Sequence, residues 1–264
     1  MLPELRRNPQ LQIRLKRIAA AVARWQILVA VILGTLACQK KREIDVPIDL
    51  LGSAYVLSSA LPGEQDLDHA LQALRETPQD PFRLREAGTL YQRLSPPDRW
   101  DYVDAAIDLL EKADLQLPND PQTLIYLGLA KAAKARGPAT SLFAKLPLAK
   151  EGFRLMDRAV AFFPESFSLR LLRAKAQLLA PAIVGRTRTL NEDRAWLEEQ
   201  LDGGERLPPH LMVMGFVFLG DYAHRAENDE PGARKWWSKA AQLGAGTPFG
   251  EQARQRLTGG SSEF

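Results

Sequence analysis

The hydrophobic positions of the chain follow a helical pattern from about residue 45 onward. Leu and Ala recur three and four residues apart between Pro and Gly residues, and no stretch sustains the apolar and polar alternation of a strand. The pattern predicts an all-α domain over residues 45–258, between a leader at residues 1–44 and a tail at residues 259–264. We expect five helical hairpins and a capping helix in this domain, over residues 45–78, 81–118, 121–164, 167–201, 208–245 and 248–257.

A short motif recurs in the second helix of three of these hairpins. It reads Ala106, Leu110, Ala113, Pro118, then Gly152, Met156, Ala159, Pro164, and then Ala233, Trp237, Ala240, Ala245. First helices carry a glycine, in Ala87-Gly88, Leu127-Gly128 and Leu219-Gly220. These offsets resemble the tetratricopeptide repeat (TPR), in which a small residue of one helix faces a large residue of its neighbour. The resemblance implies a TPR-like helical-hairpin solenoid, and the hairpin at 167–201 matches it least well.

The positive charge of the chain is concentrated in its leader. Residues 1–42 contain nine Lys and Arg residues against Glu4 alone, a net charge of +8, whereas the whole chain has +3, so the remainder carries −5. Binding to a phosphate backbone depends mainly on neutralisation of its charge. An acidic body without a basic stripe therefore excludes nucleic acid as a partner.

An apolar run of 14 residues, Trp25–Cys38, follows the basic leader. This length is typical of the hydrophobic region of a signal peptide and is short of the roughly 20 residues that span a bilayer. Cys38, preceded by Ala37, resembles the lipobox cysteine of bacterial lipoproteins, although Thr35 stands where a leucine is usual. The resemblance implies cleavage before Cys38 and its acylation. The alternative is an uncleaved anchor that extends back to Ile18, and both place the body outside the cytoplasm.

Residues capable of catalysis or metal binding are few. The chain has one Cys and three His residues, and it contains no Gly-x-Ser-x-Gly, phosphate-binding loop or His-Glu-x-x-His motif. Asp221 and His224 could pair across one helical turn, which is more typical of a helix surface than of a catalytic dyad. Of the two adjacent tryptophans, Trp237 fits the core and Trp236 an exposed position. We therefore expect no enzyme, no cofactor and no metal.

The concave face of the predicted solenoid is the remaining candidate site, because first helices line that face in proteins of this kind. Alignment of the hairpins places there Phe82, Arg85, Thr89, Gln122, Ile125, Leu129, Leu171, Lys175, Val217 and Asp221. This mixed and rather apolar surface fits an apolar helix or extended segment of a partner protein better than it fits an acidic C-terminus. The alternative is that the superhelix itself buries these residues.

The sequence thus favours a membrane-anchored, extracytoplasmic scaffold or adaptor in a bacterial envelope assembly, with other envelope proteins as partners. The repeat resembles that of lipoproteins and anchored proteins with such roles, and it selects no particular assembly. A solute- or lipid-binding accessory component of a transport system is the alternative, with a closed apolar pocket beneath the segment Phe143–Leu148.

Overall fold

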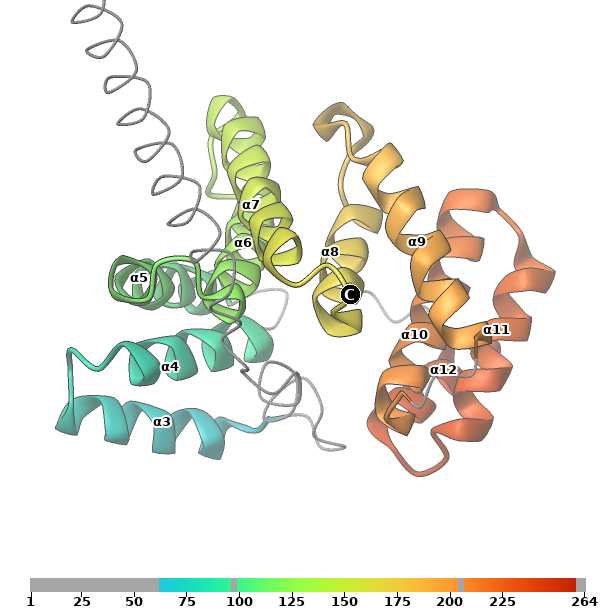
Figure 1. Cartoon of the computed structure of the whole chain (residues 1–264), viewed down its shortest axis with the longest axis horizontal. Coiled ribbons are helices and arrows are strands. Elements are labelled where there is room, and N and C mark those ends of the chain that lie inside the picture. The colour runs from blue at the N-terminus through green and yellow to red at the C-terminus, as the bar shows by residue number, and fades with distance from the viewer. Residues whose placement is uncertain (1–61, 96–98, 204–206, 260–264) are drawn as a thin grey trace, which may run out of the picture. The chain divides into compact units, whose positions relative to one another are not determined.

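The computed structural model describes residues 62–95, 99–203 and 207–259, and these residues form helices without a strand (Figure 1). The helices are α3 (Glu64–Glu76), α4 (Pro81–Leu94), α5 (Trp100–Gln116), α6 (Pro121–Arg136), α7 (Leu142–Phe162), α8 (Phe167–Leu178), α9 (Thr187–Asp202), α10 (Pro209–Tyr222), α11 (Glu230–Leu243) and α12 (Pro248–Leu257). A short 3₁₀ helix, η2 (Ala182–Val184), lies between α8 and α9, and a π-helical turn, η3 (Ala223–Glu227), follows α10. The expected all-α class is confirmed for this part of the chain.

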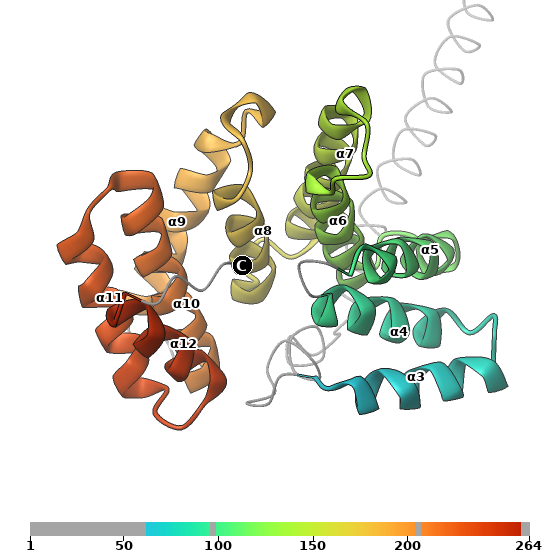
Figure 2. The same ribbon diagram turned by 180° about the vertical axis from the view of Figure 1, so that it is seen from behind.

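The helices pair as the hydrophobic pattern predicts. Helices α4 and α5, α6 and α7, α8 and α9, and α10 and α11 form the four expected pairs, and α12 occupies the position of the capping helix. Of the first expected hairpin, the described residues contain the second helix, α3, which packs against α4 (Figures 1 and 2). Proline and glycine therefore marked the helix boundaries correctly.

Helix starts follow the capping chemistry that the sequence indicates. The Asp80 carboxylate accepts a hydrogen bond from the backbone N–H of Phe82 at 2.8 Å, and Asp120 accepts one from Thr123 at 2.8 Å. Each aspartate precedes a proline at the first helical position, where no backbone donor is needed. The two Asp-Pro pairs consequently separate one hairpin from the next.

Small residues of the first helices lie against large residues of the second helices. A Cβ added to Gly88 would lie 2.7 Å from Leu110 Cγ, and one added to Gly128 would lie 2.7 Å from Met156 Cγ. Gly220 faces the Trp237 indole in the same way. The large member of each recurring motif therefore occupies space that only a glycine leaves open, which explains the period of the motif.

Trp237 is in the core, as expected, whereas the prediction that Trp236 is exposed is wrong. Trp236 is buried because the Phe216 ring of α10 stacks on it, with 5.7 Å between the ring centroids. The Lys239 ammonium lies 4.4 Å from the centroid of the same indole. Two adjacent residues of α11 are therefore buried, so its buried face is wider than a single apolar stripe.

The first helices also contact one another in succession. Helix α4 contacts α6, α6 contacts α8, α8 contacts α10, and α10 contacts α12. Alternate helices therefore form a continuous row, with a second helix packed beside each member. This row positions the candidate site described below.

Several sequence predictions fall on residues outside the described part of the chain. These are the leader at residues 1–44, the acylation of Cys38, the first helix of the hairpin at 45–78 and most of the tail at 259–264. Within the described residues, no helix combines the length and the apolar character that a bilayer crossing requires.

Candidate binding pocket

A pocket of about 1080 Å³ lies along the row of first helices and is open to solvent. Residues of α4, α6, α8, α10 and α12 line it, together with the N-terminal half of α7 and the turn at residues 179–184. The sequence analysis placed an alternative pocket beneath Phe143–Leu148, and Lys145 and Leu146 do line this one. The pocket is open, however, and the prediction that it is closed is wrong.

The walls of the pocket are mainly apolar. Leu129 of α6, Phe153 of α7, Leu172 of α8, Met214 of α10 and Phe249 of α12 all contribute to them. Alanines of α6 and α8 lie between these larger residues and leave the interior open. Such walls exclude a strongly hydrated ligand and suit an apolar one, because burial of apolar surface is the main favourable term in such binding.

The charged side chains that line the pocket are all cationic. They are Arg93, Arg136, Lys145 and Lys175, and no aspartate or glutamate occurs among the lining residues that the structure describes. Arg93, Arg136 and Lys175 lie in the last turns of α4, α6 and α8, where they also face the negative ends of helix dipoles. Three helix ends carry together about −1.5 elementary charges. Arg136, Lys145 and Lys175 exceed this among the described lining residues, so this part of the lining has a net positive charge.

Lys175 is half-buried and has no hydrogen bond or ion pair to another described residue. Asp221 is the carboxylate that acts on it electrostatically, but Asp221 is already held by Arg256, with Nε–Oδ1 and Nη2–Oδ2 distances of 2.6 and 3.1 Å. Trp237 Nε1 also donates to Asp221, at 3.1 Å. Burial lowers the pKa of Lys175 below its ordinary value, and the attraction of Asp221 offsets only part of that effect.

Tyr126 adds a neutral polar group to the pocket wall. Its side chain is buried, and burial raises the pKa of its phenol to about 12. The phenol therefore keeps its proton at neutral pH and can donate a hydrogen bond.

Three large apolar side chains are highly exposed on two elements that line the pocket, α7 and η2, and we call them the mouth residues. Leu142 and Phe143 begin α7 and are 80% and 92% exposed, and Ile183 of η2 is 75% exposed. Leu142 and Ile183 also line the pocket. Exposed apolar side chains grouped beside a pocket are typical of a binding surface, whereas isolated ones are ordinary.

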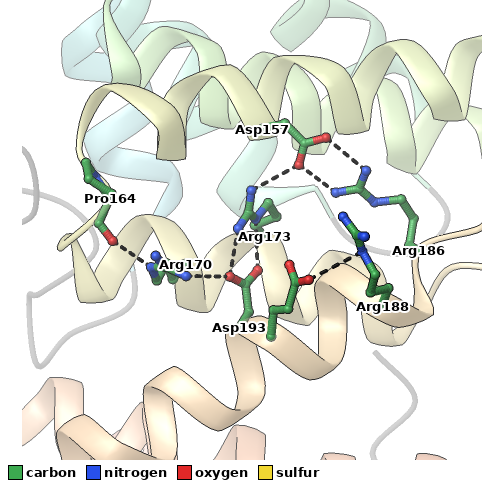
Figure 3. Close-up of polar contacts among 8 residues, drawn as sticks. Asp157, Pro164, Arg170, Arg173, Arg186, Arg188 and Asp193 are labelled. Atoms are coloured by element: carbon green, nitrogen blue, oxygen red, sulfur yellow. Dashed lines mark hydrogen bonds and ion pairs between the residues drawn. The ribbon is translucent and has the colours of Figure 1, made fainter.

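An ion-pair network fixes the wall that contains η2 (Figure 3). Arg173 of α8 bonds to Asp157 of α7 at 3.0 Å and to Asp193 of α9 at 2.7 and 2.8 Å. Arg186, which follows η2, also bonds to Asp157, and its guanidinium lies 5.1 Å from the centroid of the Phe153 ring. The turn between α8 and α9 is thereby held against α7, so the pocket wall is positioned before any ligand arrives.

The structure divides the predicted groove residues into three groups. Leu129 and Lys175 line the pocket. Phe82, Arg85 and Gln122 lie at the N-terminal ends of α4 and α6, where Phe82 is exposed, Arg85 pairs with Asp120 at 3.2 Å and Gln122 is half-buried. The third group is buried and comprises Thr89, Ile125, Leu171, Val217 and Asp221.

The prediction that the third group faces an open groove is wrong. Ile125, Leu171 and Val217 belong to the core between the helices of the row, and Asp221 is enclosed by Trp237 and Arg256. Asp221 consequently does not pair with His224, whose Nδ1 lies 2.8 Å from a Glu230 carboxylate oxygen. These five positions are buried, as the alternative interpretation held.

Sequence analysis missed Arg93, Arg136 and Lys145 as lining residues. The signal that could have identified two of them is their shared place in the last turn of successive first helices. The C-terminal ends of α4 and α6 line the pocket, whereas the predicted groove residues of these helices lie mainly in their first and middle turns.

No group of His, Cys, Asp and Glu residues suitable for a metal ion occurs among the residues that the structure describes. Comparison of the chain with protein-family models, with curated proteins and with solved structures finds no match.

Proposed function

We propose that the protein is a membrane-anchored, TPR-like scaffold that holds partner proteins together on the extracytoplasmic side of a bacterial membrane. The observation that carries this proposal is the continuous row of first helices, α4, α6, α8, α10 and α12, beside an open apolar pocket. The glycine contacts at Gly88, Gly128 and Gly220 support the TPR-like packing. Catalysis in such an assembly would belong to the partners.

The mouth residues are the surface that we assign to a partner protein. Leu142, Phe143 and Ile183 expose most of their large apolar side chains to solvent. A partner segment laid across them would remove this apolar surface from water, which stabilises a complex by roughly 25 cal/mol per Å². The partner segment is therefore expected to be apolar.

The membrane location rests on the leader. Its net charge of +8, the apolar run Trp25–Cys38 and the position of Cys38 together favour export and attachment to a membrane. Attachment through acylated Cys38 and attachment through an uncleaved span both leave the helical domain on the same side.

A second function, binding of a small ligand as an accessory component of a transport system, is favoured by the pocket itself. Small-molecule sites are typically apolar concavities of about 300–1000 Å³ with few polar groups. The pocket has a volume of about 1080 Å³ and this kind of lining. Scaffolding and ligand binding use different parts of the site, the mouth and the interior.

The scaffold proposal is tested by cross-linking in intact membranes. The variants Phe143→Asp and Ile183→Asp should lose the cross-linked partners identified by mass spectrometry, and they should fold normally, because exposed substitutions change stability by less than about 0.5 kcal/mol. Leu115→Asp is the matched control, since Leu115 is 84% exposed and does not line the pocket. An unchanged set of partners in both mouth variants would contradict the assignment of this surface.

A further inference from the structure

A positively charged side chain, Lys175, lies inside a pocket whose walls are mainly apolar. Lys175 lies half-buried among apolar residues of α8 and α10 without a carboxylate of its own, and its neighbour Asp221 is occupied by Arg256 and Trp237. A charge in such surroundings is costly unless an opposite charge accompanies it. The other charged residues in the described part of the lining cannot supply one, because they are cations as well.

We propose that the pocket binds small anionic amphiphiles, molecules with one acidic headgroup and an extended apolar body, with the headgroup beside Lys175. The apolar body would lie against Leu129, Leu172 and Met214. This inference rests on the second function proposed above and names the chemical class of its ligand. It is independent of what the mouth residues bind.

The charges of the lining and its apolar walls together favour an anionic amphiphile over other ligands. A cationic or zwitterionic ligand would place a positive charge beside Arg136, Lys145 and Lys175, and the described lining residues include no acid that compensates it. A polar anion such as a sugar phosphate would leave its hydroxyl groups against Leu, Met and Phe side chains. An acid on an apolar chain satisfies Lys175 and the walls simultaneously. The lowered pKa of Lys175 agrees with a site that lacks its counterion.

The headgroup chemistry is shared by carboxylates and phosphates. Free fatty acids carry the first group, and alkyl phosphates carry the second. Both accept hydrogen bonds from an ammonium group, so both are compatible with Lys175.

Photo-crosslinking of the full-length protein in its membrane tests the proposal. Four twelve-carbon probes with the same diazirine are compared, and they differ only in their headgroup: carboxylate, phosphate, alcohol and trimethylammonium. Labelled peptides are identified by mass spectrometry. We expect at least tenfold more labelling of pocket peptides, such as those containing Leu129, Leu172 or Met214, by an anionic probe than by the ammonium probe.

The variant Lys175→Met assigns the headgroup position, because it keeps the length of the side chain and removes its charge. It should reduce labelling by the anionic probes toward that of the alcohol probe and leave the alcohol probe unchanged. Lys150→Met is the control, since Lys150 is exposed on α7 and does not line the pocket. A melting curve of each variant shows whether it is folded, and the comparison of probes on the unmodified protein does not depend on any variant.

Each result decides a different point. Equal labelling by the alcohol and anionic probes would overturn the anionic selectivity and leave ligand binding in place. Absence of pocket labelling by every probe would overturn both. Anionic selectivity that persists in Lys175→Met would overturn the assignment of the headgroup to Lys175. The ratio of carboxylate to phosphate labelling identifies the source of the acid.

Discussion

Arg173 and Asp193 form a two-pronged ion pair in the buried contact between α8 and α9. Arg173 Nε lies 2.8 Å from Asp193 Oδ2 and Nη2 lies 2.7 Å from Oδ1. Arg170 adds a third hydrogen bond to the same carboxylate at 3.2 Å. This hairpin matches the recurring motif least well, and these ion pairs join its two helices. The pair also holds the pocket wall through Asp157 and Arg186.

Replacement of Asp193 by alanine should destabilise the protein by about 3–5 kcal/mol, because it leaves two arginine side chains without a buried counterion. Thermal melting followed by circular dichroism measures the loss. Glu192→Ala is the control on the same helix, since Glu192 is exposed and pairs only with exposed Arg188. If the two variants have the same melting temperature, the network does not stabilise the hairpin.

Ile125 and Leu129 lie one turn apart on α6, yet they should respond differently to a charge. Ile125→Asp would bury a carboxylate in the core and should cost several kcal/mol of stability, on the order of 3 or more. Leu129→Asp would place the carboxylate in the cationic pocket and should cost much less. Melting temperatures of the two variants test this directly. Equal and large losses would show that Leu129 is core rather than lining.

The pKa of Tyr126, raised by burial to about 12 from an ordinary value of 10, predicts a loss of stability at high pH. Between these values the folded protein holds the phenolic proton that the unfolded chain releases. The stabilisation is therefore complete below pH 10 and disappears as the pH rises through about 12, by about 2–3 kcal/mol in total.

The variant Tyr126→Phe should not show this part of the alkaline loss, although it retains the apolar packing. Urea unfolding of both proteins at a series of pH values measures the difference. Parallel curves for the two proteins would mean that Tyr126 ionises at an ordinary pKa.

Processing of the leader should leave a mature chain that begins at Cys38 and carries acyl mass. Intact-mass measurement of protein extracted from membranes detects both changes, and Cys38→Ser should abolish them. The alternative anchor predicts an unmodified chain that retains the basic residues Arg6 to Arg24. That mass would refute acylation and support the uncleaved span.

Local sequence determined the elements of the described domain and their pairing. Asp80-Pro81 and Asp120-Pro121 begin helices because capping and proline geometry act within a few residues. The close contacts of Gly128 with Met156 and of Gly220 with Trp237 agree with the motif, because helix geometry sets the spacing of its small and large residues. Such features need no knowledge of distant residues.

The site depended on tertiary structure, because a pocket is a property of several helices at once. Ile125 and Leu129 share one helix and similar chemistry, and only the rotation of α6 against its neighbours decides that the first is core and the second is lining. The charge of the pocket likewise arises from Arg93, Arg136, Lys145 and Lys175, which are far apart along the chain. Asp221 could not be placed from the sequence for the same reason. Local spacing allowed it to pair with His224, but Arg256, 35 residues away, binds its carboxylate, and Lys175 has no ion pair with another described residue.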